Sequence, residues 1–221
     1  MDIQALIKLD QQLLLWFNNH QTDFLNHFFS LYTGKVEWIF AAAVIVFILI
    51  KNYKKESIWI LVLLVLTVVL TDQISNVIKY TVARPRPTHE PLLQGLVKPV
   101  FGNLAGKYGF LSAHAANSFA FALFTTLLFK NRIYGVVIFL WAALNAYTRM
   151  YLGVHYPGDI LAGSLLGLMV ASFTFGLLDK IVLKKSVDKK VSRLDLSFIY
   201  IALGLTVLAL AFISILRAYV I

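Results

Sequence analysis

The sequence contains no cysteine, which excludes disulfides, a thiolate nucleophile and zinc bound through cysteine. Charged residues are also scarce: they form 14% of the 221 residues, whereas hydrophobic residues form 59% and the mean hydropathy is +0.76. A soluble domain carries about 25% charged residues, so this composition indicates a protein that crosses a membrane several times. The net charge of +9 lies in short loops beside apolar runs, which favours a role in membrane orientation over nucleic-acid binding.

The first 34 residues include no run that is apolar enough to cross a bilayer. Residues 1–20 mix apolar with charged and amide side chains, which is typical of an amphipathic helix in the membrane interface, with Trp16 at the headgroup level. Residues 22–33 predict a second short, half-buried interfacial helix that Gly34 closes. No small-residue cleavage site follows an apolar core, so we expect no removable signal peptide.

The rest of the chain predicts an all-α, polytopic membrane bundle of about six transmembrane helices, in one domain that covers residues 1–221. The expected spans are 36–50, 57–80, 114–129, 133–151, 157–178 and 196–216. The first is short, and Trp38 is a candidate anchor for one of its ends. Gly163 and Gly167, four residues apart in the fifth span, predict a close helix contact.

The distribution of cations predicts the orientation of this bundle. Eleven of the 20 lysines and arginines lie in three connections on one side: Lys51, Lys54, Lys55, Lys130, Arg132, Lys180, Lys184, Lys185, Lys189, Lys190 and Arg193. Because positive loops stay in the cytoplasm, the loops 81–113 and 150–156 and both termini are expected on the opposite face.

Polar residues that suit a phosphate group collect at this opposite face. Asp72, Asn76 and Lys79 share one helix face near the end of the second span, where we expect Asp72 and Asn76 to join an interhelical network. Arg84-Pro85-Arg86-Pro87 follows and ends the helix, because proline lacks an amide donor. The guanidinium group matches phosphate oxygens in shape and charge, although such a segment alone is also typical of a basic loop.

Two further blocks carry histidines. Ser112 is a candidate N-cap for the third span, which would place His114 beside any anion at the helix N-terminus; a capped helix with an incidental histidine is the alternative. Arg149 ends the fourth span, and Asp159 follows His155 by four residues, in the first turn of the fifth span. A carboxylate that accepts from one ring nitrogen leaves the other free as a nucleophile or base, although an aspartate at a helix start is also ordinary electrostatics.

Taken together, the three blocks read Lys79, six residues, Arg86-Pro87; then Ser112-x-His114; then Arg149, five residues, His155, three residues, Asp159. This order and spacing resembles the type 2 phosphatidic acid phosphatase (PAP2) family of membrane lipid phosphatases, which includes bacterial undecaprenyl-diphosphatases and lipid A phosphatases. The resemblance implies that His155 attacks phosphorus to form a phosphohistidine, that Asp159 orients His155, and that His114 protonates the leaving group and then activates water.

The resemblance also implies that Lys79, Arg86 and Arg149 neutralise the phosphoryl oxygens, that the Ser112 hydroxyl and the Ala113 amide bind them, and that neither a metal nor a cofactor takes part. Two positions depart from the family pattern: Ala113 stands where glycine is common, and Thr148 where serine is common. Arg84 lies outside the pattern; an extra phosphate contact and a solvated charge are its two alternative roles, and we expect the solvated charge.

The expected function is therefore hydrolysis of a lipid phosphate or diphosphate at the outer face of a bacterial cytoplasmic membrane, with the bilayer and its lipids as the only implied partners. Undecaprenyl diphosphate is the first choice, because the short loop 88–113 leaves little apparatus for a large sugar headgroup. Lipid A and phosphatidylglycerol phosphate are the alternative substrates. A non-enzymatic anion-binding or transport protein is the competing hypothesis, and it predicts polar residues through the middle of several spans.

Overall fold

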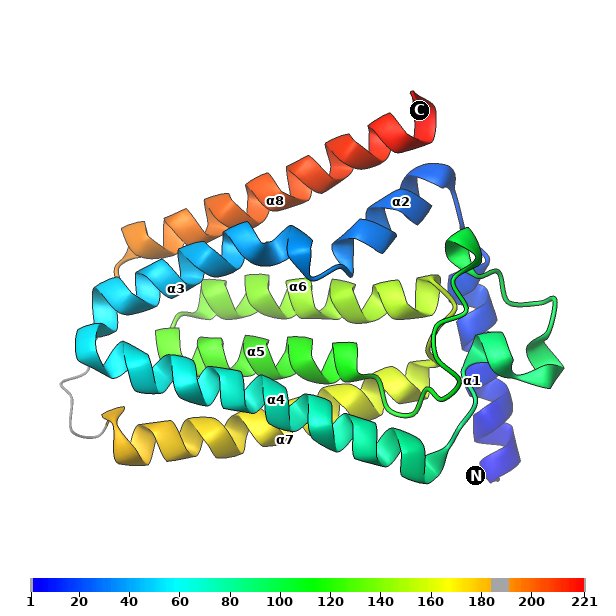
Figure 1. The fold of residues 1–221 in the computed structure, drawn as a ribbon, viewed down its shortest axis with the longest axis horizontal. Coiled ribbons are helices and arrows are strands. Elements are labelled where there is room, and N and C mark those ends of the chain that lie inside the picture. The colour runs from blue at the N-terminus through cyan, green and yellow to red at the C-terminus, as the bar shows by residue number, and fades with distance from the viewer. Residues whose placement is uncertain (1, 184–190, 221) are drawn as a thin grey trace.

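Six long helices build the bundle in the computed structural model, which describes residues 2–183 and 191–220. They run side by side along the long axis of the molecule (Figure 1): α3 (Ile39–Tyr53), α4 (Ser57–Val82), α5 (Ala113–Phe129), α6 (Arg132–Tyr151), α7 (Pro157–Ile181) and α8 (Arg193–Tyr219). No strand is present in these described ranges, so the predicted all-α class is confirmed.

The bundle is that of a multi-pass membrane protein. Within the part of the chain that the structure describes, four segments are long and apolar enough to cross a bilayer. The first of them, Val36–Val82, holds both α3 and α4, whereas α5 is apolar but shorter. Large apolar side chains on the outer faces are exposed, among them Leu165 and Phe173 on α7 and Leu208 and Phe212 on α8. Such surfaces are stable only against lipid. The number of six spans stays a prediction.

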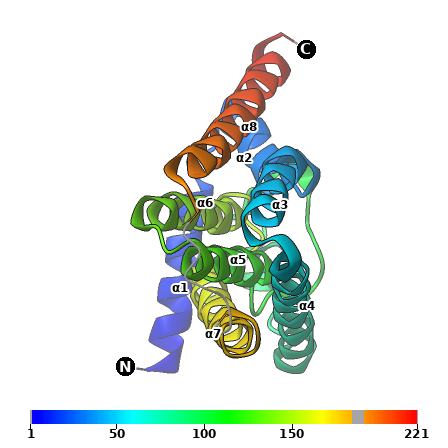
Figure 2. The same cartoon turned by 90° about the vertical axis from the view of Figure 1, so that its left-hand side faces the viewer.

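Helix α5 occupies the centre of the bundle, with α4, α6 and α7 around it (Figure 2). Its contact with α7 is the closest, because a Cβ atom at Gly163 would collide with the Ser112 carbonyl oxygen and one at Gly167 would collide with the Ala116 carbonyl oxygen. Only glycine permits this approach of the backbones. The predicted close contact at these two glycines is confirmed.

The N-terminal segment differs in part from expectation. Helix α1 (Ile3–Asn18) lies across the end of the bundle, as a helix in the membrane plane would, with Trp16 exposed. Helix α2 (Asp23–Tyr32) instead packs along α8 and leads into α3 through a short turn at Val36–Trp38, so it is part of the bundle. The expected anchoring role of Trp38 is wrong: its side chain is buried and its indole nitrogen donates to the Tyr32 carbonyl oxygen at 2.8 Å.

Connections at the two ends of the bundle separate the cations from the proposed site. The α3–α4 turn with its short helix Lys54–Glu56, the α5–α6 turn, the end of α7 and the start of α8 lie at one end (Figure 1). Loop 83–112, with the single-turn helices Pro87–His89, Pro91–Leu93 and Val100–Gly102, lies at the other end with the α6–α7 turn. Among the predicted loop cations, Lys184, Lys185, Lys189 and Lys190 lie outside the described residues.

Candidate active site

Loop 83–112 begins where α4 ends at Ala83, whose left-handed backbone (φ 50°) turns the chain away from the helix axis. The next residues pair with the end of the same loop, since the Arg86 amide donates to the Lys107 carbonyl oxygen at 3.0 Å and the Gly109 amide to that of Arg84 at 2.9 Å. A Cβ at Gly109 would lie 3.1 Å from Arg86 Cγ. The loop is thus closed tightly and holds Arg86 over the α6–α7 turn.

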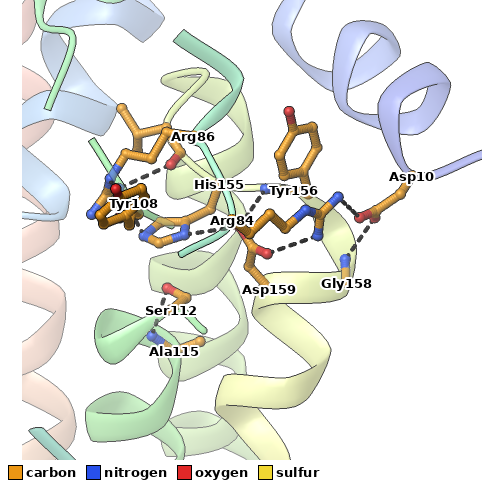
Figure 3. Close-up of polar contacts among 11 residues, drawn as sticks. Asp10, Arg84, Arg86, Tyr108, Ser112, Ala115, His155, Tyr156, Gly158 and Asp159 are labelled. Carbon is orange, nitrogen blue, oxygen red and sulfur yellow. Dashed lines mark hydrogen bonds and ion pairs between the residues drawn. The ribbon is translucent and has the colours of Figure 1, made fainter. Parts of the chain in front are cut away.

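The side chain of Arg86 reaches inward from this loop and is buried. Its Nε donates to the Tyr108 carbonyl oxygen at 3.0 Å, and its Nη1 donates to the Val154 carbonyl oxygen at 2.9 Å and to His155 Nε2 at 3.0 Å. Figure 3 shows the guanidinium beside the imidazole ring. The two motifs, about 70 residues apart, therefore meet as the resemblance implies.

His155 is held in one orientation by two partners. Its Nδ1 lies 3.2 Å from Asp159 Oδ2, and its Nε2 lies 3.0 Å from Arg86 Nη1 (Figure 3). A carboxylate only accepts and a guanidinium only donates, so Nδ1 carries the proton and Nε2 presents its lone pair. This tautomer is the one that a nucleophilic imidazole needs.

The electrostatic surroundings also keep His155 neutral. Burial lowers the pKa of His155 well below its usual 6.5, and the positive charges of Arg86, Arg149 and Lys79 lower it further. Because these three charges act on one ring, the cations of the first and third motifs surround the same point, where an anion would be stabilised.

Asp159 is fully buried and accepts three hydrogen bonds. Oδ2 accepts from His155 Nδ1 and from the Tyr156 amide at 3.1 Å, while Oδ1 accepts from Arg84 Nη1 at 2.9 Å. The Tyr156 bond arises because α7 begins at Pro157, which puts Asp159 at its third position, where a carboxylate reaches back to the capping residue. The helix start itself therefore aims the carboxylate at His155.

Ser112 caps α5, as predicted, since its hydroxyl accepts from the Ala115 amide at 3.4 Å. Its own amide donates to the Asp159 carbonyl oxygen at 3.0 Å, which joins the α5 start to the α7 start. Ala113 and His114 form the first turn of α5. His114 also lines a cavity of about 290 Å³ that lies inside the bundle.

Arg149 and Lys79 complete the set of cations. Arg149 Nη1 donates to Thr33 Oγ1 at 2.9 Å, and its buried Nε has no hydrogen-bond partner among the residues that the structure describes. Lys79 lies half-buried in the last turn of α4. The expected interhelical network takes another form, because Asp72 accepts from Asn76 of its own helix at 3.1 Å, while the neighbouring Thr71 bonds Asn117 of α5.

The expectation for Arg84 is wrong, because its guanidinium is an organised part of the site. Nη1 pairs with Asp159 Oδ1 at 2.9 Å and Nη2 with Asp10 Oδ2 at 2.7 Å, and the group lies 3.9 Å from the centre of the Tyr156 ring (Figure 3). Asp10 Oδ1 in turn accepts from the Gly158 amide at 2.7 Å. Asp10 was not among the residues predicted for the site, since nothing in the spacing connects it with partners that lie 74 and 148 positions later.

A membrane-embedded helical bundle that gathers three cations, two histidines and a carboxylate at one end is the arrangement of a membrane lipid phosphatase. The chain belongs to the PAP2 superfamily, whose family model matches residues 59–182. This range contains all the candidate site residues that the three motifs predict, but not Asp10 or Thr33.

Curated relatives extend this similarity beyond the motifs. The chain is 44% identical over 168 residues to a lipid A 4'-phosphatase of Bacteroides thetaiotaomicron, covering 75% of each chain. It is 37% identical over 175 residues to a lipid A 4'-phosphatase of Porphyromonas gingivalis, covering 78% of this chain and 74% of the relative. An undecaprenyl-diphosphatase of Sulfolobus acidocaldarius is 31% identical and covers 63% of each chain.

Two solved structures share the fold. Aquifex aeolicus LpxE has a TM-score of 0.60 and 23% sequence identity, covering 75% of this chain and 93% of that one. The PAP2-type phosphatidylglycerolphosphate phosphatase of Bacillus subtilis has a TM-score of 0.63 and 23% identity, covering 80% and 88%. The protein is thus a PAP2 membrane phosphatase that acts on lipid phosphates.

Proposed function

We propose that the protein hydrolyses a phosphate monoester of a phosphorylated glycolipid of the lipid A type, through a phosphohistidine at His155. The observation that carries the mechanism is the placement of His155, with its Nδ1 on Asp159 and its Nε2 directed at Arg86. The relatives favour lipid A over undecaprenyl diphosphate, the first choice from the sequence. The short loop 88–113 therefore does not argue against a sugar headgroup.

In the first step, His155 Nε2 attacks phosphorus and forms the N–P bond. Before this attack, Arg86 moves its Nη1 donor from Nε2 to the phosphoryl oxygens, because the Nε2 lone pair forms the new bond. Lys79 and Arg149 also face these oxygens. The P–O bond to the lipid breaks, and its electron pair takes a proton from the His114 imidazolium, so that the lipid leaves as an alcohol.

In the second step, neutral His114 accepts a proton from water while the water oxygen attacks phosphorus. The N–P bond breaks, its electron pair returns to Nε2, and inorganic phosphate leaves, with both histidines restored. The Ser112 hydroxyl and the Ala113 amide would donate to phosphoryl oxygens at the α5 N-terminus. Three fixed cations supply the positive charge, so we expect activity without a metal.

The membrane is proposed to be a bacterial cytoplasmic membrane, with the site on its outer face. The α3–α4 turn with Lys54 and Lys55 and the α5–α6 turn with Lys130 lie at the opposite end of the bundle from the α6–α7 turn, which holds His155. Such positively charged connections stay in the cytoplasm. The lipid substrate would then be dephosphorylated after it reaches the outer leaflet.

The proposal is tested by phosphate release in detergent with EDTA, from lipid A, prenyl diphosphate and phosphatidylglycerol phosphate. We expect lipid A to be preferred, His155→Ala to be inactive, and His89→Ala, which alters an exposed loop histidine, to retain activity. Acid-labile phosphate on the wild type but not on His155→Ala would identify the intermediate. Faster phosphate release from another lipid would show that lipid A is not the preferred substrate. Phosphate release by His155→Ala would show that His155 is not the nucleophile.

A further inference from the structure

The two halves of helix α1 have different surroundings. In the second half Leu14 and Asn18 are fully buried, and Asn18 Nδ2 donates to the carbonyl oxygens of Tyr151 at 2.7 Å and Lys98 at 3.0 Å. In the first half residues 3–9 are all exposed, although most of them are apolar. The bundle therefore encloses the second half of α1 and leaves the first half uncovered.

Asp10 lies at the boundary between these halves and reaches the active site in two ways (Figure 3). Its Oδ2 pairs with Arg84 Nη2 at 2.7 Å, and Arg84 Nη1 pairs with Asp159 Oδ1 at 2.9 Å. Its Oδ1 accepts from the Gly158 amide at 2.7 Å, in the first turn of α7. An amide at this position has no acceptor within its own helix, so Asp10 supplies a cap for α7 from another part of the chain.

Both contacts act on the carboxylate that holds His155. Asp159 follows Gly158 directly, and its Oδ2 lies 3.2 Å from His155 Nδ1. Arg84 holds the other oxygen of the same carboxylate. A shift of α1 would therefore reach His155 through Arg84 and through the start of α7. This step rests on the function proposed above, in which His155 attacks phosphorus.

The membrane covers the apolar side of α1. This helix lies across the end of the bundle, whereas α7 runs along the axis that spans the bilayer (Figure 1). The two helices meet in a groove of about 330 Å³, lined mainly by apolar side chains such as Leu6, Leu13 and Leu161. Leu161 is 67% exposed and belongs to the outer face of α7, which faces lipid. The lipid that covers α7 therefore also meets α1 in this groove.

We propose that phospholipid at the membrane surface holds α1 in place, and that Asp10 is the positioning residue through which α1 orients Asp159 and His155. A helix of 16 residues with an uncovered apolar side has little stability in water, whereas a lipid interface stabilises it. Without lipid the first half of α1 frays, and Asp10 at its boundary leaves Arg84. Asp10 lies outside residues 59–182, which match the family model, so this role is separate from the three motifs.

The first test separates positioning from folding with a double-mutant cycle. Asp10→Asn removes the charge that Arg84 pairs with and keeps an oxygen for the Gly158 amide. On the best lipid of the panel above, we expect kcat to fall about tenfold and KM to stay within about twofold. In an Arg84→Gln background the same change should cost less than about twofold, because Asp10 acts through Arg84.

Asp2→Asn is the matched control for this cycle. Asp2 is exposed and caps α1, and asparagine caps a helix as well as aspartate does. The control should keep the kcat of wild type. Full kcat in Asp10→Asn, or an equal loss with and without Arg84, would overturn the positioning role.

The second test changes the lipid contact. In phospholipid vesicles, a variant with both Leu6→Gln and Leu13→Gln should lose about fivefold in kcat, and less than about twofold when Asp10→Asn is also present. Gln12→Ala, at an exposed polar position of α1, is the control and should keep full activity. Unchanged kcat in the leucine variant would overturn the coupling to the membrane.

A fluorescent label reports the position of α1 without any enzymatic activity. The chain has no cysteine, so Leu9→Cys takes a single label, which quenchers attached to lipid acyl chains should reach. A label that only a water-soluble quencher reaches would show that α1 lies in water and would overturn the lipid contact. Phosphate release from no lipid would overturn the proposed function itself, while the label would still decide whether α1 meets lipid.

Discussion

Arg84 connects three parts of the chain through its side chain alone: α1 through Asp10, α7 through Asp159, and the α6–α7 turn through Tyr156. It does not contact His155; it acts on the carboxylate that holds His155. Asp159 is completely buried, and three hydrogen-bond donors offset the cost of burying its charge. Arg84 supplies the cationic donor of the three. Arg84 is therefore a positioning residue.

We expect Arg84→Gln to lower kcat by about 10- to 100-fold, the size expected for a lost hydrogen bond between charged groups. KM should change by less than about twofold, because the side chain is engaged by Asp10 and Asp159 and not by substrate. Steady-state kinetics on the preferred lipid measure both constants, with exposed Lys107→Gln as the control.

Arg84→Lys should recover only part of kcat, since an ammonium lacks the planar fork that reaches both carboxylates. A raised KM with unchanged kcat would place Arg84 in substrate binding instead.

His155 makes stability depend on pH. Its pKa in the folded protein lies well below the 6.5 of the unfolded chain, because of burial and the charges of Arg86, Arg149 and Lys79. Below pH 6.5 the unfolded chain binds a proton that the folded protein does not, so the free energy of unfolding falls as pH decreases. For this one group the loss is about 1 kcal/mol between pH 7 and pH 5.5.

Thermal unfolding in detergent at these two pH values, for wild type and His155→Gln, isolates this contribution. The variant lacks the ionisable ring, so its stability should depend less steeply on pH than that of wild type. An identical pH dependence for both proteins would show that His155 is not held neutral. Inorganic phosphate should weaken the effect, because an anion beside the ring favours its charged form.

Among the helices, the contact between α5 and α7 determines how the two histidine motifs meet. Gly163 lies against the Ser112 carbonyl and Gly167 against the Ala116 carbonyl, so the start of α5 rests directly on the backbone of α7. The hydrogen bond from the Ser112 amide to the Asp159 carbonyl depends on the same approach. The distance between His114 and His155 is thus a property of helix packing.

Gly167→Ala should therefore destabilise the protein by about 1–3 kcal/mol and reduce activity, because the added methyl group meets backbone that cannot rotate away. Gly176→Ala on the same helix is the control, since no atom lies within 4 Å of the position that its added methyl group would take. It should leave stability unchanged or raise it by up to about 1 kcal/mol. Thermal unfolding and phosphate release measure both effects. Equal behaviour of the two variants would contradict the close contact.

For the molecule as a whole, the separation of cations from the site predicts its orientation in the membrane. Because the chain has no cysteine, a single introduced cysteine is a unique label. Lys107→Cys lies in the site loop and Lys55→Cys in the α3–α4 turn, and both positions are exposed. On intact cells, a membrane-impermeant maleimide should label Lys107→Cys only, and lysis should expose Lys55→Cys. The reverse pattern would place the active site in the cytoplasm.

The sequence by itself determined what depends on local pattern: the apolar helices, the Ser112 cap, the glycine contact and the spaced motifs that identify the family. Helix periodicity and capping act within a few residues, so they can be predicted from neighbours in the chain. It also anticipated the His155–Asp159 pair, because His155 lies in the turn just before α7 and Asp159 lies in the first turn of that helix.

Only the tertiary structure decided the roles of Arg84, Asp10 and Thr33. Arg84 is 74 positions from Asp10 and 75 from Asp159, and Arg149 is 116 from Thr33, so no local pattern connects them. Arg84 was expected to be solvated because a charge beside prolines in a loop usually is. Whether such a charge meets water or a carboxylate depends on how α1 lies across the bundle end, and that arrangement follows from the packing of the whole chain.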